Sequence, residues 1–300
     1  MTRAGCALVF AVLLAAVAAE AQNLEPRAFS NAPVDLNFLV VGYAYSHGDV
    51  AFDSSVPIKD ASLTTQATFL GYGRVLDLWG RTAKLDVVLP YAWVSGSALI
   101  AGQLRETAVS GLGDPQVRFS ALLYGGPALS AADFVDYTQD LIVGASLAVT
   151  APLGQYDSNR VVNVGTNRWS VKPELGISKA LGPVILELES SVTFYTDNND
   201  FLGRKVEKEP IYAVQGHVVY HTRIGFWMAL DATYYAGGRV TIDGKQGTEP
   251  EHSRLGATIA IPIDRYNSVK LYGSAGASPR LGGDFYTAGI AWQIRWGGGY

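Results

Sequence analysis

The most regular feature of the chain is an alternation of apolar and polar side chains with a period of two residues. In NRWSVKPELGIS, residues 167–178, one phase is apolar: Trp169, Val171, Pro173, Leu175 and Ile177. The other phase is charged or small: Arg168, Ser170, Lys172, Glu174, Gly176 and Ser178. A soluble antiparallel sheet also alternates, but its apolar face needs a protein core, and a lipid bilayer can replace that core.

The same period defines twelve segments, each about as long as a tilted membrane-spanning strand and bounded by Gly, Pro, Asn or Asp. They are 35–47, 62–76, 82–94, 114–124, 139–151, 167–179, 184–196, 210–221, 226–236, 253–261, 267–276 and 284–296. A helical period would spread the charges around the whole circumference. Because backbone groups cannot stay unpaired in hydrocarbon, the sheet must close. We therefore predict an all-β fold, a transmembrane antiparallel up-and-down β-barrel of about twelve strands.

The connections between these segments alternate in length. The long polar connections lie near 47–61, 95–113, 152–166, 197–209 and 237–252. The short connections lie near 77–81, 180–183, 222–225 and 262–266. Residues 125–138 are too long for the short turn expected there, and we predict one helical turn around residues 131–135. Long loops outside and short periplasmic turns are typical of outer-membrane barrels.

We predict a targeting signal at each end of the chain. Residues 1–21 combine MTR, an apolar run and a small-residue cleavage site, so we predict a secretory signal peptide followed by a barrel over 22–300. Cleavage would remove Cys6, the only cysteine, and with it any thiol chemistry. The last segment alternates up to the terminal Tyr300 and resembles the signal read by the barrel-assembly machinery. The expected location is the outer membrane of a Gram-negative bacterium.

Aromatic residues near the predicted strand ends suit the girdles that outer-membrane barrels place at the two lipid–water interfaces. These residues are Tyr91, Trp93, Trp169, Tyr195, Tyr234, Trp292 and Trp296.

The charged residues are distributed and face inward on this assignment. The chain has 27 acidic and 23 basic residues, a formal net charge of -4, and no basic block that would indicate nucleic-acid binding. The expected lumen-lining residues are Lys84, Asp86, Asp114, Arg118, Arg168, Lys172, Glu174, Glu187, Glu189, Asp231, Arg254, Lys270 and Arg295. Such a network either fills and braces the interior or lines a narrow polar path.

The remaining motifs predict neither a metal, nor a cofactor, nor a catalytic residue. His217 and His221 share one face of a strand but lie too far apart to bind one metal. Residues 197–209 lack the oxygen ligands and glycine of a calcium loop, so we interpret them as an exposed loop. Residues 111–115 lack the ending of a phosphate loop and form a turn entering a strand.

Three stretches carry a resemblance to a known family. SGLGDP at 110–115, APLGQYD at 151–157 and NVGTNRWSVKPELGIS at 163–178 are similar to sequences of the outer-membrane transporter family named for the meta-pathway of phenol degradation. The resemblance implies an outer-membrane barrel that admits hydrophobic or aromatic compounds. It carries over no catalytic residue, so Asn167, Arg168, Trp169, Lys172, Pro173 and Glu174 are motif matches without assigned roles.

The function expected from these observations is that of a channel or facilitated-diffusion transporter for small molecules, with outer-membrane lipid and a solute as its partners. Two alternatives stay open. The barrel could be a sealed structural or surface-binding scaffold, or a membrane-embedded hydrolase that combines a serine with His217 or His221.

Overall fold

A computed structural model describes residues 25–49, 58–100, 103–222, 224–281 and 284–299. The predicted signal peptide, Cys6 and Tyr300 lie outside these described residues. In the part of the chain that is described, no helix has the length and apolar character needed to span a bilayer.

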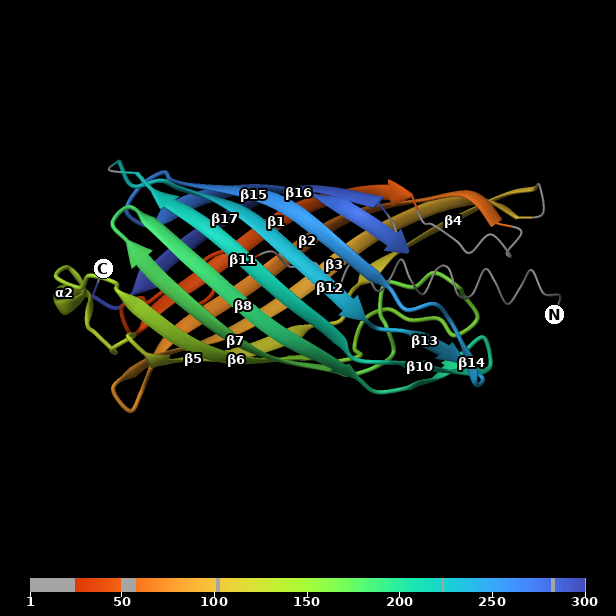
Figure 1. The fold of residues 1–300 in the computed structure, drawn as a ribbon, viewed down its shortest axis with the longest axis horizontal. Coiled ribbons are helices and arrows are strands. Elements are labelled where there is room, and N and C mark those ends of the chain that lie inside the picture. The colour runs from red at the N-terminus through yellow and green to blue at the C-terminus, as the bar shows by residue number, and fades with distance from the viewer. Residues whose placement is uncertain (1–24, 50–57, 101–102, 223, 282–283, 300) are drawn as a thin grey trace.

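The described chain forms a closed antiparallel β-barrel of twelve strands, as predicted (Figure 1). The barrel strands are β1 (Leu36–Asp49), β2 (Ile58–Leu78), β3 (Arg81–Ile100), β5 (Gln116–Tyr124), β6 (Leu141–Thr150), β7 (Ser170–Leu181), β8 (Val184–Tyr195), β11 (Ile211–His221), β12 (Trp227–Gly237), β15 (Glu251–Pro262), β16 (Asn267–Leu281) and β17 (Asp284–Gly297). The first and last strands pair from Leu36 opposite Gly297 to Asp49 opposite Asp284, which closes the barrel.

The two faces of the wall follow the predicted alternation. Leu175 and Leu188 point outward with 60% and 56% of their surface exposed, whereas Glu174 and Glu189 point inward and are 4% and 3% exposed. A closed sheet has no unpaired edge within the bilayer, and its outer apolar face meets lipid instead of a protein core.

The predicted aromatic girdle contains one error. Trp93, Trp169, Tyr234, Trp292 and Trp296 are exposed on the outer face. Tyr195 instead shares the inward phase of β8, packs against Ile211, Ala213 and Tyr235, and lies under the Lys208 ammonium at 3.7 Å. The strand phase, not the position at a strand end, decides which face an aromatic residue occupies.

Short connections gather at one end of the barrel, here called the short-turn end. Trp79 and Gly80 join β2 to β3 with φ values of 53° and 79°, as a two-residue turn of the mirror-image type requires. The predicted helical turn is confirmed as α2 (Ala131–Phe134), whose N-cap Ser130 accepts a hydrogen bond from the Asp133 N–H. Short turns face the periplasm in outer-membrane barrels, so this end is periplasmic.

The opposite, long-loop end is more ordered than the sequence pattern indicates. The interpretation of 95–113 as a polar connection is wrong, because β3 continues to Ile100 and returns as β4 (Gln103–Leu112). β3 pairs with β5 up to Val88 and with β4 from Tyr91. Pro90 stands where the partner changes, so its missing N–H interrupts neither ladder.

The interpretation of 197–209 as an exposed loop is also wrong. It forms β9 (Asn198–Phe201) and β10 (Arg204–Lys208), which join β13 (Val240–Ile242) and β14 (Lys245–Gln246) in a second sheet. Phe201 and Val206 pack there against Val240 and Ile242. Tyr156 packs on this cluster and donates to the Asp200 carbonyl, and burial raises the pKa of its hydroxyl. The sheet lies beyond the barrel wall at the long-loop end (Figure 1).

Candidate functional site

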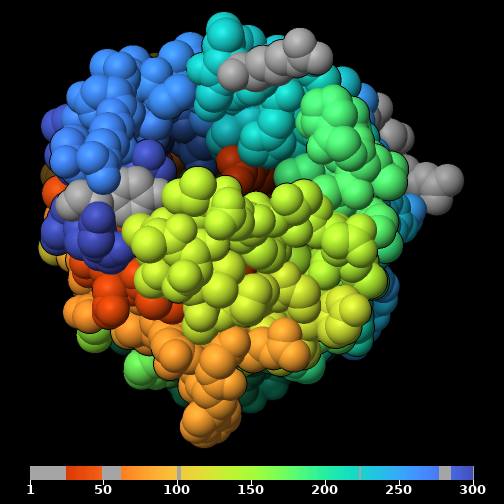
Figure 2. Space-filling view, turned by 90° about the vertical axis from the view of Figure 1, so that its left-hand side faces the viewer, coloured from red at the N-terminus to blue at the C-terminus, as the bar shows by residue number. Residues whose placement is uncertain are grey.

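The barrel lumen contains the described N-terminal segment, residues 25–34, here called the strap. The strap enters at the short-turn end, where the Val34 N–H donates to the Leu129 carbonyl at 2.9 Å. The next amide, of Asp35, donates to the Val75 carbonyl at 3.0 Å. Figure 2 looks into this mouth and shows red N-terminal atoms at its centre, partly covered by the yellow-green connection between β5 and β6. The strap therefore lies across the path that would connect the two ends.

Charged and polar contacts hold the strap along the wall. The Arg118 guanidinium of β5 donates to the Glu25 carboxylate at 2.7 Å and 3.3 Å. The Arg27 N–H donates to the Glu187 carboxylate of β8 at 2.7 Å, and Lys84 of β3 donates to the Ala28 carbonyl at 3.3 Å. Charge-assisted hydrogen bonds of this kind are stronger than neutral ones. Three separate strands thus fix the position of the strap.

A polar contact nearer the mouth anchors the base of the strap. Asn31 accepts a hydrogen bond from the Thr82 hydroxyl at 2.6 Å and donates to the Pro127 carbonyl at 3.2 Å. Both Asn31 and Thr82 are buried. Because buried polar groups are costly to leave unpaired, these hydrogen bonds hold the base of the strap at the mouth.

One apolar side chain of the strap sits in a slot of the wall. Phe29 is 2% exposed and lies against Gly144 of β6 and Gly176 of β7, which are direct partners in the sheet. A Cβ added to Gly144 would lie 2.2 Å from the Phe29 ring, and one added to Gly176 would lie 2.3 Å from it. Only glycine leaves room for the ring at these two positions.

Several of the sequence-predicted inward residues pair with one another in the lumen. Arg118 also approaches Asp86 at 3.4 Å, and Lys172 approaches Glu174 at 3.2 Å. Glu187 accepts a hydrogen bond from the Ser178 hydroxyl at 3.0 Å. When two opposite charges are buried side by side, their attraction offsets part of the free-energy cost of removing them from water. These paired charges give the interior a hydrogen-bonded polar surface beside the apolar slot of Phe29.

The other predicted residues of the strand interiors are also turned away from lipid. Glu189, Asp231 and Arg254 are buried, and Arg254 donates to the Ser274 hydroxyl at 2.8 Å. Lys270 is half-buried, with its ammonium 5.9 Å from the centre of the Tyr272 ring.

Three predicted residues lie near the rims. The Asp114 carboxylate accepts hydrogen bonds from the N–H groups of Gly154 and Thr166, both at 2.8 Å, and so fastens the connection between β6 and β7. Arg168 is buried just before β7. Arg295 donates to the Arg265 carbonyl at 2.8 Å at the short-turn end. The alternation of the sequence does not give the height of a residue in the barrel, so it could not separate these three residues from those in the middle of the lumen.

A buried histidine–carboxylate pair lies on the inward face of β11 and β12. His217 Nδ1 is 2.6 Å from an Asp231 oxygen, and the Thr258 hydroxyl donates to the other oxygen at 3.3 Å. A nucleophile triad would need a hydroxyl at the second ring nitrogen. Among the described residues nothing hydrogen-bonds to His217 Nε2, and no group of three or more His, Cys, Asp or Glu could hold a metal ion.

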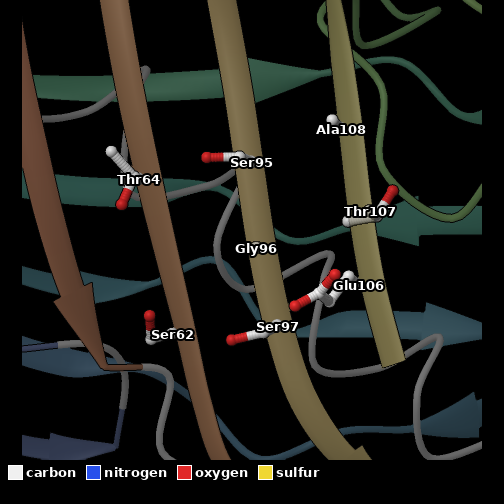
Figure 3. A pocket seen from close by; sticks show the side chains of 8 residues that line it. All are labelled: Ser62, Thr64, Ser95, Gly96, Ser97, Glu106, Thr107 and Ala108. Atoms are coloured by element: carbon white, nitrogen blue, oxygen red, sulfur yellow. The ribbon is translucent and has the colours of Figure 1, made fainter. Parts of the chain in front are cut away.

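A second hollow lies outside the lumen, on the outer face of β2, β3 and β4 (Figure 3). Its walls are formed by Ser62, Thr64, Ser95, Gly96, Ser97, Glu106, Thr107 and Ala108. Sheet pairing sets Thr64 beside Ser95 and Ser62 beside Ser97, just beyond the exposed Trp93. The outer face therefore changes from apolar to hydroxyl-bearing where the strands leave the lipid.

Sequence reasoning did not find the strap. Glu25, Arg27 and Phe29 belong to no periodic segment, and their partners lie far away in the sequence. One signal was present, because Gly144 and Gly176 both fall on the inward phase of adjacent strands. Two small residues side by side in a lumen indicate that something packs over them.

Solved structures with this architecture are outer-membrane barrels. The COG4313 outer membrane channel from Pseudomonas putida F1 superposes with a TM-score of 0.78 at 22% identity, over 91% of this chain and 100% of that chain. The transport unit of the autotransporter AIDA-I from Escherichia coli gives 0.57 at 11% identity, over 96% and 98%. The translocator domain of NalP from Neisseria meningitidis gives 0.52 at 11% identity, over 97% and 100%. At these identities the likeness shows the fold.

Sequence comparison identifies the family. No curated protein sequence matches the chain. The family described as "Putative MetA-pathway of phenol degradation" matches residues 46–261, which begin within β1 and end within β15. The match covers more than half of the 300 residues and agrees with the resemblance carried by residues 110–115, 151–157 and 163–178. The chain belongs to this family and folds as an outer-membrane β-barrel.

Proposed function

We propose that this protein is an outer-membrane channel for small molecules whose lumen the strap closes at rest. The observation that carries the proposal is the construction of the lumen. A closed barrel surrounds a charged inner surface, and a segment that belongs to no barrel strand lies within it. A barrel that is only a scaffold could fill its interior with strand side chains alone.

The inner charges support the passage of small polar or weakly polar solutes. Arg118 and Lys172 lie beside the acidic Asp86 and Glu174, so neither sign dominates the inner face. A pore lined by charged side chains of a single sign would select strongly for ions of the opposite sign. The family description points to aromatic compounds as the solute class, and the Pseudomonas structure of the same fold is a channel.

The strap supports a path that opens and closes. Its hold consists of non-covalent contacts with three strands and one slot, while its base is fixed at the mouth through Val34 and Asn31. Withdrawal of residues 25–30 would uncover the inner faces of β5 to β8 without breaking any barrel strand pair.

The strap also favours the alternative of a sealed scaffold, and one experiment separates the two. The chain lacking residues 1–21 is refolded into planar bilayers and liposomes, and conductance and uptake are compared for phenol and for a sugar of similar size. A channel passes current and phenol, and the variants Lys172→Ala and Glu189→Ala change the passage. A heat-modifiable barrel that passes neither, even after residues 22–30 are deleted, contradicts the channel.

The second proposed partner is the barrel-assembly machinery, which would recognise β17. Support comes from the exposed Tyr286, Ile290, Trp292 and Trp296 on one face of that strand. Replacing Trp296 by Ser should lower the amount of folded protein recovered from outer membranes. The same variant refolded from urea into detergent should give the normal barrel, which distinguishes an assembly defect from instability.

A further inference from the structure

We propose that the slot between Gly144 and Gly176 is a binding site for the ring of a monocyclic phenol, and that Phe29 occupies it as an internal surrogate. The inference rests on the proposed function, because the phenol must reach the lumen to compete with the strap. It adds to that function a location, a solute class and a mechanism of opening.

The slot has the dimensions of one aromatic ring. Cβ positions built on Gly144 meet Cδ1, Cε1 and Cγ of Phe29, and those built on Gly176 meet Cδ2, Cε2 and Cγ. The two edges of the ring therefore lie over two different strands, and the ring spans both. Since Gly144 and Gly176 are direct partners in the sheet, their backbones form a continuous floor. A flat ring can use this floor, whereas an aliphatic chain would leave part of it uncovered.

The slot is apolar on the side of β5 and toward the short turns. Leu122 of β5 and Ile142 of β6 pack with Phe29 in one cluster and are 2% and 0% exposed. Their contact with the ring removes apolar surface from water, which drives aromatic binding without regard to the identity of the ring. The slot should therefore bind aromatic rings, and the Phe29 ring occupies it while the strap is docked.

The rim on the side of β8, across the two glycines from β5, is polar, and the Phe29 ring has no polar group to use it. Glu189 of β8 is the sheet partner of Gly176, so its side chain points inward beside the slot. Among the described residues no hydrogen bond or ion pair engages its carboxylate. A hydroxyl on the ring could donate to this carboxylate, an interaction that phenylalanine cannot make. A phenol therefore gains a contact that its competitor lacks.

The geometry also links binding to opening. A ring in the slot excludes Phe29, because both would occupy the volume over the same two glycines. The strap then keeps its polar contacts at Glu25, Arg27 and Ala28 and those of its base at Asn31 and Val34. Solute and strap thus compete for one site, and the apparent affinity of the solute is reduced by the fraction of strap that is docked.

The test measures binding of 4-fluorophenol to the barrel lacking residues 1–21, in lipid nanodiscs, by fluorine NMR titration. Phe29→Ala removes the surrogate and should tighten apparent binding by about tenfold. Adding Gly176→Ala to that variant should abolish saturable binding, because the new Cβ fills the floor of the slot. Gly71→Ala is the matched control, since its Cβ would meet Val40 at an ordinary 3.6 Å on the same inner face. Heat-modifiability verifies folding, and Gly144→Ala replaces Gly176→Ala if that variant does not fold.

Two results would overturn the site. One is unchanged binding after Phe29→Ala, and the other is equally tight binding after the further change to Gly176→Ala. Fluorobenzene tests the hydroxyl contact. Phe29→Ala should bind it about tenfold more weakly than 4-fluorophenol, and adding Glu189→Met, which has no acceptor oxygen, should abolish that difference. Equal affinities for the two probes would refute the role of Glu189. If the barrel binds the probes as expected but never conducts, the channel is refuted and the binding site stands. If it conducts but binding does not depend on the slot, the binding site is refuted and the channel stands.

Discussion

Replacing Phe29 by Ala should release the strap and hold the channel open. The ring is 2% exposed, and truncating a buried Phe to Ala costs about 3 kcal/mol at the lower end of the usual range. Since each 1.4 kcal/mol is a factor of ten, the ratio of displaced to docked strap should rise roughly 100-fold. Glu25→Gln should have a smaller effect, because the Glu25 side chain is 39% exposed and Arg118 keeps Asp86 as its partner, so the lost pair should contribute about 1 kcal/mol.

Single-channel recording in planar bilayers measures this ratio directly as the open probability at low voltage. Phe119→Ala provides the matched control, because Phe119 lies on the lipid face of β5 and is 39% exposed. Its open probability should equal that of the unchanged protein. The reasoning is refuted if Phe29→Ala leaves the open probability unchanged, or if Glu25→Gln raises it more than Phe29→Ala does.

Three further predictions concern the rims. Asp114→Ala removes the acceptor of the Gly154 and Thr166 amides, so trypsin should cleave at Arg160 faster than in the unchanged barrel, and equal cleavage rates would contradict this anchoring role. Val206→Asp places a charge in the buried cluster of the second sheet. Amide exchange should accelerate in β9 and β10 while the barrel keeps its heat-modifiable migration. If the barrel also lost that migration, the second sheet and the barrel would unfold as one unit, and the prediction would be wrong. Hydrogen bonds from the amides of Tyr266 and Asn267 hold the pKa of Asp264 below its ordinary value. The stabilisation of this turn is therefore present above the unfolded pKa and is lost as the pH falls through the lower folded pKa. Amide exchange at Tyr266 and Asn267 should stay slow at pH 5, and Asp264→Ala should accelerate it.

The barrel wall could be predicted from the sequence because lipid and lumen impose opposite demands on alternate positions. Leu175 and Glu174 are neighbours in the chain, and the phase of each is enough to assign its face. The same reasoning predicts that inward charges pair, as Lys172 and Glu174 do. Period-two patterning therefore captures whatever depends on the wall alone.

The additions beyond the wall follow other rules. The strap acts through contacts between residues such as Glu25 and Arg118, which are separated by 93 positions, and no local pattern records them. Strand β4 has no apolar face, since both of its faces meet water, so its alternation resembles that of a loop. In the second sheet, Phe201 and Val206 are isolated apolar residues among charges in the sequence. They form a buried core only together with Val240 and Ile242, which belong to a distant segment.

The extension of β3 into β4 restores a strand edge that barrel closure removes elsewhere. Over the described residues β4 pairs with β3 alone, and near its end the Leu112 carbonyl accepts the Gln155 N–H. An open edge outside the membrane is a template on which a strand of a neighbouring molecule can add. Arg105 and Glu106 are exposed on this edge strand, and joining a second strand would remove water from both charges. Two charges at this rim therefore oppose the addition of a further strand there.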